Sequence, residues 1–160
     1  MTLDYVRMTV MKLTRTAVCS LLVTAIVTAP AWAALGGDAA SVHSDLVRMK
    51  GTLRMTSSAA YTVHEITTSY GTVVREYISP ADKVFAVSWR GPMIPDLRQT
   101  LGDYYGQYEQ AASAPHSGHR HLAIDQPGLV VRSSGRMRAF FGRAWVPSLL
   151  PQNFSVNQIN

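Results

Sequence analysis

Two short turns between β-rich runs constrain the fold of this chain more than any other feature of its sequence. The three runs cover residues 61–68, 72–78 and 84–90. Each is rich in β-branched and aromatic residues, which favour strands. The turns span 69–71, with Gly71 available for positive φ, and 79–83, with Pro80 suited to a turn. Because parallel strands need a long crossover, turns this short predict an antiparallel meander.

The strongest helical pattern in the chain follows the meander, over residues 96–112. Pro95 and Asp96 suit a first helical turn, where backbone amides lack partners and an acid is favoured. Apolar and tyrosine side chains recur at helical spacing: Leu97, Leu101, Tyr104, Tyr105, Tyr108 and Ala112. This stripe predicts an amphipathic helix that covers one sheet face. Gly102 and Gly106 predict a close approach of that helix to the sheet. A short helix is also predicted over 42–49.

Strand patterns return in the last third of the chain. The predicted strands are 122–124, 128–133 and 136–145. The last two form a hairpin around Ser134 and Gly135, and residues 152–160 read as a polar tail. The element order β-β-β-α-β-β predicts an α+β domain. It has a single antiparallel sheet of about five strands, with one amphipathic helix packed on a face.

The first 33 residues have the order of a secretory signal peptide. Basic residues precede an apolar run at 16–28, and Ala31 and Ala33 supply the small residues that a signal peptidase accepts. The run has 13 residues, fewer than the roughly 17–25 that a spanning helix needs. We therefore expect cleavage after Ala33. Residues 34–160 are predicted to be a single exported domain, periplasmic or secreted, with a flexible leader and no transmembrane segment.

Charge and cysteine content change with that cleavage. The full chain has 15 Lys and Arg, 10 Asp and Glu, and a formal net charge of +5. Cleavage removes three basic residues, one acidic residue and the single cysteine, Cys19, so the net charge falls to +3. No disulfide and no cysteine ligand is then available. A weakly basic exported domain gives little reason to expect nucleic acid, and none is predicted as a partner.

Several runs in residues 34–160 resemble an exported bacterial family. The most specific are VVREYISP at 73–80 and GRMRAFFGRAW at 135–145, and the others include YTVHEI at 61–66, KVFAVSWRGP at 83–92 and PDLRQTLGDYY at 95–105. The chain is similar to the domain-of-unknown-function family 2844 over nearly all of this region. The resemblance implies export and one compact domain. It implies no activity, ligand or catalytic residue.

A cluster of arginines in the last hairpin is the candidate ligand site. Arg136, Arg138 and Phe140 are predicted to share one strand face, with Arg132 across the turn. Guanidinium groups beside an aromatic ring can hold a phosphate, a sugar acid or another anionic envelope polymer. The alternative is that these arginines only make a solvent-exposed sheet face soluble. On the binding hypothesis, substituting Arg136 and Arg138 abolishes retention on an anionic envelope fraction.

Histidines provide two further candidate sites. His116, His119 and His121 lie within six residues and could bind a transition metal, although the sequence favours a solvated surface loop, because an H-x-x-H-x-H loop has no fixed ligand geometry. His64, with a carboxylate on a neighbouring strand, could form a general base. Cross-strand pairing of glutamate with arginine accounts for those carboxylates without catalysis.

The sequence contains no nucleophile context, so no catalytic residue and no cofactor is predicted. The leading prediction is a non-catalytic binding or envelope-accessory domain, whose partner is an anionic envelope component or an envelope protein. One alternative is a metal-dependent or histidine-based hydrolase. Another is a subunit of an envelope complex.

Overall fold

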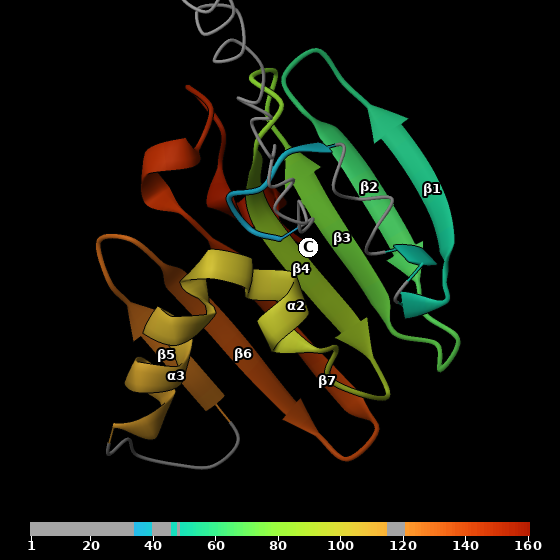
Figure 1. The fold of residues 1–160 in the computed structure, drawn as a ribbon, viewed down its shortest axis with the longest axis vertical. Helices are drawn as coiled ribbons and strands as arrows, with labels where there is room; N and C mark the ends of the chain where they lie inside the picture. The colour runs from blue at the N-terminus through green and yellow to red at the C-terminus, as the bar shows by residue number, and fades with distance from the viewer. Residues whose placement is uncertain (1–33, 40–45, 48, 115–120) are drawn as a thin grey trace, which may run out of the picture.

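The computed structural model of the chain describes residues 34–39, 46, 47, 49–114 and 121–160. Within these ranges seven strands form one antiparallel sheet, and a helical segment joins the fourth strand to the fifth (Figure 1). The strands are β1 (Thr52–Ser57), β2 (Thr62–Thr67), β3 (Val73–Ile78), β4 (Val84–Gly91), β5 (His121–Asp125), β6 (Val130–Arg136) and β7 (Ala139–Trp145). The predicted α+β class, with a single antiparallel sheet, is confirmed. The sheet has seven strands rather than about five.

The strand order in the sheet is β1-β2-β3-β4-β7-β6-β5. Strands β1 to β4 follow the chain as a meander, and the helical segment then carries the chain to the far edge of the sheet (Figure 1). Strands β5 to β7 return from that edge to the centre. The two meanders therefore meet at the β4–β7 pair, whose register runs from Ala86 opposite Trp145 to Gly91 opposite Phe140.

A helical segment of three pieces lies on one face of the sheet (Figure 1). The pieces are α2 (Leu97–Leu101), η3 (Gly102–Tyr104) and α3 (Tyr105–Ser113). The Asp96 carboxylate caps α2 by accepting from the next two helical amides, at 2.9 and 3.2 Å. The predicted helix is confirmed, but Gly102 interrupts it at φ +51°, where a side chain would overlap Ala34. Gly106 faces open space, so the prediction that it approaches the sheet is wrong.

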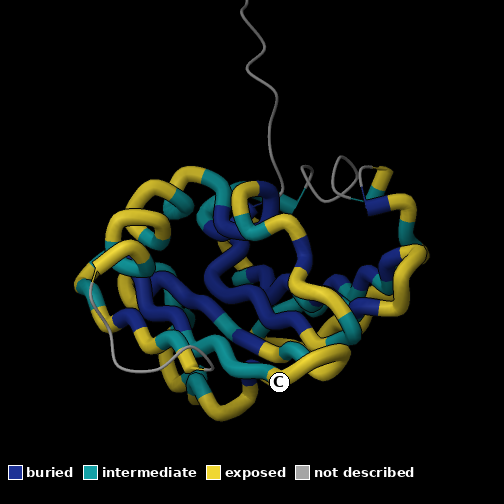
Figure 2. The backbone as a smooth tube through the Cα atoms, turned by 90° about the horizontal axis from the view of Figure 1, so that it is seen from below, coloured by how far each residue is buried: buried dark blue, intermediate teal, exposed yellow. Residues whose placement is uncertain are grey.

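Two apolar clusters lie on opposite faces of the sheet, which forms the buried middle layer (Figure 2). The helix-side cluster includes Leu35, Ile66, Val74, Val87, Trp89, Leu101, Leu129, Val131 and Ala144. The opposite cluster includes Tyr77, Phe85, Ala86, Val130, Trp145 and Ile159. The stripe of the helical segment, from Leu97 to Ala111, packs against the first cluster. Each face of the sheet therefore carries its own apolar cluster.

The C-terminal tail covers part of the second face. It contains two short 3-10 helices, η4 (Pro147–Leu149) and η5 (Val156–Gln158). The Phe154 ring meets the Phe85 ring edge to face, with centroids 4.8 Å apart, and Ile159 is buried. The sequence predicted a polar tail at 152–160. The tail instead packs on the sheet, because its few apolar side chains fall on one side of it.

Residues 34–37, predicted as a flexible or extended leader, are bonded to the domain, and Ala34 and Leu35 lie in the core. The Leu35 side chain is 1% exposed, and its amide donates to the Thr100 carbonyl at 3.2 Å. The Gly36 amide donates to the Val84 carbonyl at 2.8 Å, and the Val84 amide donates to Gly37 at 2.9 Å. These bonds join the segment to both the helical segment and β4.

Two local features of the sheet differ from the predictions. Strand β1 was not predicted, because only Leu53 of its six side chains is even partly buried and no apolar alternation marks it. In β4 the register shifts, so that Ile78 pairs with Val84 and Tyr77 pairs with Ala86. Phe85 therefore lies in the tail-side cluster while Trp89 lies in the helix-side cluster. Strict alternation along 84–90 predicts that Phe85, Val87 and Trp89 share one face, and this prediction is wrong for Phe85 because of the register shift.

Most of the short helix predicted over 42–49 lies outside the described residues. Residues 46, 47 and 49, which are described, are helical. The predicted signal peptide, residues 1–33, also lies outside them. Among the residues that the structure describes, no helix combines the length and the apolar character needed to cross a membrane.

Candidate functional site

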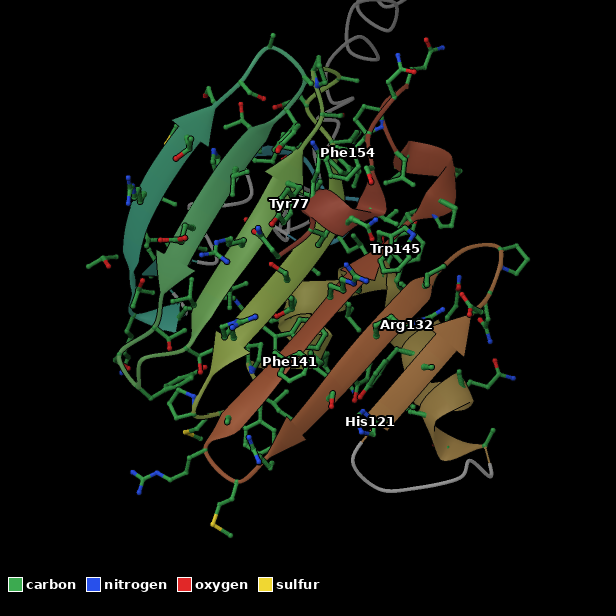
Figure 3. The ribbon with its side chains drawn as sticks, turned by 180° about the vertical axis from the view of Figure 1, so that it is seen from behind. Tyr77, His121, Arg132, Phe141, Trp145 and Phe154 are labelled. Atoms are coloured by element: carbon green, nitrogen blue, oxygen red, sulfur yellow. The ribbon has the colours of Figure 1, made fainter. Side chains whose placement is uncertain are left out.

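Part of the sheet face that the tail leaves uncovered lies over β4, β7, β6 and β5 (Figure 3). Alternation along the strands places one set of polar and aromatic side chains there. We call this set the arginine groove: Arg90, His121, Arg132, Ser134, Arg136, Phe141 and Arg143. Figure 3 shows His121, Arg132 and Phe141 on this face. The groove is therefore built on the surface of four paired strands rather than on loops.

One cross-strand row runs along the groove from β4 to β5. In it Arg90 is opposite Phe141, Phe141 is opposite Ser134, and Ser134 is opposite His121. The guanidinium carbon of Arg90 lies 6.0 Å from the centre of the Phe141 ring, and that ring is 50% exposed. Ser134 Oγ and His121 Nδ1 are 2.8 Å apart. The row thus offers an exposed aromatic surface between a cation and a hydrogen-bonded polar pair.

The next row places two arginines directly opposite each other, Arg143 on β7 and Arg132 on β6. Like charges in this position repel, and each guanidinium turns to a different partner. Arg143 donates to the tail carbonyls of Val156 and Ile159, at 3.1 and 3.4 Å. Arg132 forms an ion pair with Asp125 and also donates to a β5 carbonyl. These two arginines therefore already carry structural contacts.

The remaining arginines of the groove are available to a ligand. Among the described residues, Arg90 and Arg136 have no hydrogen-bond or ion-pair partner, and both are exposed. Two adjoining hollows, of about 640 and 510 Å³, share Arg90, His121, Ser134 and Phe141 in their linings. Neither hollow is lined by an aspartate or glutamate of the described residues. The groove therefore has a positive potential and the volume of a small-molecule site.

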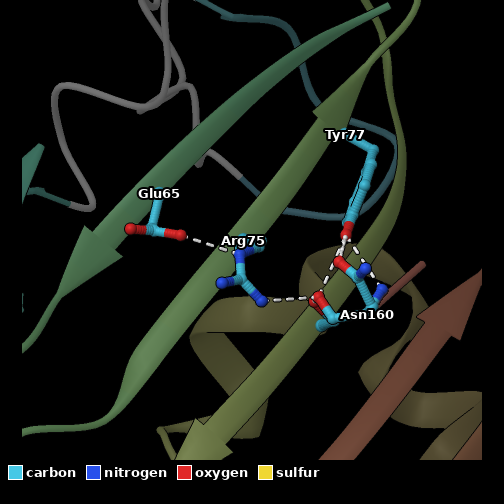
Figure 4. A network of polar contacts seen from close by, with 5 residues as sticks. Glu65, Arg75, Tyr77 and Asn160 are labelled. Atoms are coloured by element: carbon cyan, nitrogen blue, oxygen red, sulfur yellow. Dashed lines mark hydrogen bonds and ion pairs between the residues drawn. The ribbon is translucent and has the colours of Figure 1, made fainter. Parts of the chain in front are cut away.

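One wall of the groove is the end of the tail, which is fixed by Asn160 (Figure 4). The Asn160 backbone oxygen accepts from Arg75 Nη1 at 2.7 Å, Ser88 Oγ at 2.9 Å and the Tyr77 hydroxyl at 3.1 Å. The Asn160 amide donates to the Tyr77 hydroxyl at 3.0 Å. Arg75 Nε in turn donates to Glu65 at 2.8 Å. The wall is thus bonded to two strands of the sheet.

Of the four residues predicted as a ligand site, Arg136, Arg138 and Phe140 line the 640 Å³ hollow and Arg132 lines the 510 Å³ hollow, but they come from different parts of the hairpin. Arg132 and Arg136 lie in the groove, on β6. Arg138 lies in the β6–β7 turn, because the pairing of Arg136 with Ala139 leaves only Met137 and Arg138 to connect the strands. Phe140 precedes Phe141 on β7 and points to the other face. The prediction that Arg136, Arg138 and Phe140 share one strand face is wrong, because the turn lies two residues after Gly135.

The predicted metal site falls mostly outside the described residues. His116 and His119 lie there, and His121 is the first residue of β5. Among the described residues, no group of three His, Cys, Asp or Glu side chains could hold a metal ion.

His64, the candidate general base, lies on the helix side of the sheet. It is 7% exposed and stands opposite Glu76 in the β2–β3 register. Burial lowers the pKa of His64 below its ordinary value of 6.5, and the charge of Asp82 opposes that effect. The cross-strand alternative is present in the structure, as the pair between Glu65 and Arg75. In this arrangement a substrate in solution does not reach the His64 ring.

Sequence reasoning missed Arg90 and Phe141, the two residues that define the groove. Arg90 is the last residue of the third β-rich run, and a charged residue in that position indicates only that the strand ends in solvent. Alternation along 136–145 predicts that Phe141 shares a face with Arg143, but the β6 residues opposite Phe141 depend on the position of the turn. The turn at Met137 and Arg138 puts Ser134 opposite Phe141, and Arg136 lies two residues further along the same face of β6.

The fold and the groove define a class: a small α+β domain with one antiparallel sheet, a helical segment on one face and an open arginine-bearing surface on the other. Residues 31–159 match the family model described as protein of unknown function (DUF2844), and the chain belongs to this family. The resemblance seen in the sequence is thereby confirmed. No curated protein and no solved structure matches the chain.

Proposed function

We propose that this protein is an exported, non-catalytic domain that binds an acidic saccharide of the cell envelope in the arginine groove. The observation that carries the proposal is the half-exposed Phe141 ring, which lines one hollow together with Arg90 and Arg136, two arginines without a hydrogen-bond or ion-pair partner among the described residues. A flat aromatic surface suits the apolar face of a sugar ring, and guanidinium groups suit its carboxylate. Together they favour a sugar acid over a bare phosphate.

Export is supported by the signal-peptide pattern of residues 1–33. The family match begins at residue 31, beside the predicted cleavage after Ala33. A binding role is supported by the composition of the groove. Within the described part of the chain, no carboxylate lines either hollow beside the hydrogen-bonded pair of Ser134 and His121, so the pair lacks there the third member that a nucleophilic triad uses to orient its base.

Calorimetric titration of the processed protein with a uronic-acid oligosaccharide tests this function. The matched ligand is the same oligosaccharide with its carboxylates methyl-esterified. We expect binding of the acid and at least tenfold weaker binding of the ester, because the ester cannot form the charged hydrogen bonds. Equal binding of both, or binding of neither, would contradict the proposal.

Two variants connect that binding to the groove. Arg90→Gln and Phe141→Ser are each expected to weaken binding of the acid about tenfold or more. Arg54→Gln is the matched control, because Arg54 is exposed on β1 and lines neither hollow of the groove. If Arg54→Gln weakens binding as much as Arg90→Gln does, the effect is one of net charge and the groove is not the site.

A further inference from the structure

One end of the molecule gathers exposed apolar side chains. Seven large apolar side chains of the described residues are exposed. Four of them lie in connections at the same end: Tyr70 (40%), Met93 (53%), Ile94 (44%) and Met137 (89%). We call these four residues, with Lys50, Arg136 and Arg138, the tip. Clusters of exposed apolar side chains of this kind mark interaction sites.

The sheet register brings these connections together at the lower end of the molecule in Figure 1. The start of β3 pairs with the end of β4, through Val73 and Arg90, and the end of β4 pairs with the start of β7, through Gly91 and Phe140. Thr72 Oγ1 donates to the Met93 carbonyl at 2.7 Å. The β2–β3 turn and the loop after β4 are therefore fixed to each other, and the β6–β7 turn projects beside them.

Charge is distributed unequally between the two ends. Lys50, Arg136 and Arg138 are exposed at the tip, and Arg90 lies directly behind them in the groove. Asp96 is the one acidic residue in the loop after β4, and its carboxylate is occupied as the cap of α2. At the opposite end, the β3–β4 turn carries Asp82 and Lys83, and Asp125 ends β5, where it is paired with Arg132. The tip is thus apolar at its surface and basic around it.

The β6–β7 turn is built from residues that are poorly suited to a turn. Arg138 has φ +63°, in the left-handed region that favours glycine or asparagine. Met137 beside it is 89% exposed, so its side chain contributes little to the core. Unfavourable backbone at an exposed position points to a use other than folding. Here the turn holds an apolar side chain and a cation outward, on the shortest possible loop.

We propose that the tip docks on a membrane surface that carries anionic lipids. Met137, Met93 and Ile94 enter the headgroup region, and the surrounding basic side chains contact lipid phosphates. The combination fits a lipid surface, because exposed apolar side chains and nearby cations each contribute to the free energy of binding to an anionic membrane. A protein partner would need a groove with an apolar centre and acidic groups around it. The test below distinguishes such a partner from a lipid surface. This inference goes beyond the proposed function, since it does not use the Phe141 surface of the groove.

Co-sedimentation of the processed protein with vesicles tests the docking. Vesicles of phosphatidylcholine alone are compared with vesicles that contain one quarter phosphatidylglycerol. We expect binding to the mixed vesicles only, reduced strongly at high salt. Met137→Ser should weaken that binding about tenfold, and Arg138→Gln about fivefold. Met55→Ser is the control, because Met55 is 61% exposed on β1, outside the tip, and should leave binding unchanged.

Several outcomes would overturn the docking. These are equal binding to both vesicle types, absence of binding, and equal effects of Met137→Ser and Met55→Ser. Capture of acidic soluble protein with no vesicle binding would assign the tip to a protein partner instead. The two proposals fail separately: Phe141→Ser should lose the acidic saccharide and keep the vesicles, and Met137→Ser should do the reverse. Thermal melting of each variant confirms that it is folded.

Discussion

Arg138, in the β6–β7 turn, is an exposed residue whose positive φ lowers the stability of the fold. In the left-handed region an L side chain costs about 1–2 kcal/mol, whereas glycine adopts this region readily but loses more backbone entropy on folding. We therefore expect Arg138→Gly to stabilise the domain by about 0.5–1 kcal/mol. The expected rise in melting temperature is a few degrees, measured by calorimetry.

The same variant should weaken vesicle binding, because it removes a cation from the tip. Arg136→Gly serves as the comparison, since residue 136 is in β6 and does not have positive φ. That substitution should destabilise the strand rather than stabilise the domain. A fall in melting temperature for Arg138→Gly would show that the turn is not strained.

His64 connects stability to pH. Its pKa is lowered in the folded state, because burial penalises the charged ring. Between the ordinary value of 6.5 and the lower folded value, the unfolded chain binds a proton that the folded chain does not. The free energy of unfolding therefore falls as pH drops below about 6.5, and the contribution of His64 is fully present above that pH.

The measurement is the melting temperature at pH 7.5 and at pH 5.5, for the natural protein and for His64→Gln. The natural protein should lose more stability on acidification than the variant does. Identical losses would assign the acid sensitivity to other groups. His121→Gln is a suitable control, because His121 is exposed and hydrogen-bonded to Ser134.

At the scale of strands and helices, two glycines in regular elements should respond in opposite ways to the same substitution. Gly142 of β7 stands opposite Trp89, and a methyl group there would overlap the indole ring. Gly106 of α3 has no atom near the position of a side chain. Gly142→Ala should therefore destabilise the domain by about 1–3 kcal/mol. Gly106→Ala should stabilise it by about 0.5–1 kcal/mol through helix propensity.

Chemical denaturation of both variants gives the comparison directly. The denaturant slope should remain unchanged, so that the shift in midpoint reports stability alone. A stable Gly142→Ala protein would mean that Trp89 has room to move and that the β4–β7 contact is looser than it looks.

Sequence patterns identify the elements that bury a continuous apolar face and miss those that do not. The run at 84–90 and the stripe from Leu97 to Tyr108 bury apolar side chains at regular spacing, and both elements were predicted. Strand β1 is an edge strand with one partly buried side chain, so tertiary pairing with β2 makes it a strand. The hairpin turn was misplaced because Gly135 suits a turn, while Arg138 occupies the position that needs positive φ.

The same displacement limited what could be said of the site. Arginine content was visible in the sequence, but which arginines share a face depends on strand register, and one misplaced turn changes it. Arg90 joins the groove only because β4 pairs with β7 across the whole helical segment. No local pattern contains that pairing. The site could therefore be predicted by residue type but not by its geometry.

For the whole molecule, the predicted cleavage after Ala33 falls at the start of the core. Ala34 is 3% exposed and Leu35 is 1% exposed, directly after the predicted cleavage. We expect the protein recovered from the periplasm or medium to begin at Ala34, as measured by intact mass. A cut after Leu35 would remove a buried side chain that contributes about 2–5 kcal/mol. Recovery of a stable protein that begins beyond residue 35 would contradict this.

The sheet order also determines when the fold can be completed. The central pair joins β4 to β7 across the whole helical segment, and the backbone oxygen of Asn160 is bonded to residues more than seventy positions earlier. A chain made from its N-terminus can pair β1 to β4 early, but its two halves join only after nearly all of it has been synthesised. Such non-local topologies fold slowly, in milliseconds to seconds. If the chain is exported as proposed, this delay would keep the precursor unfolded during translocation, so the strand order would give a translocation channel time to accept the chain.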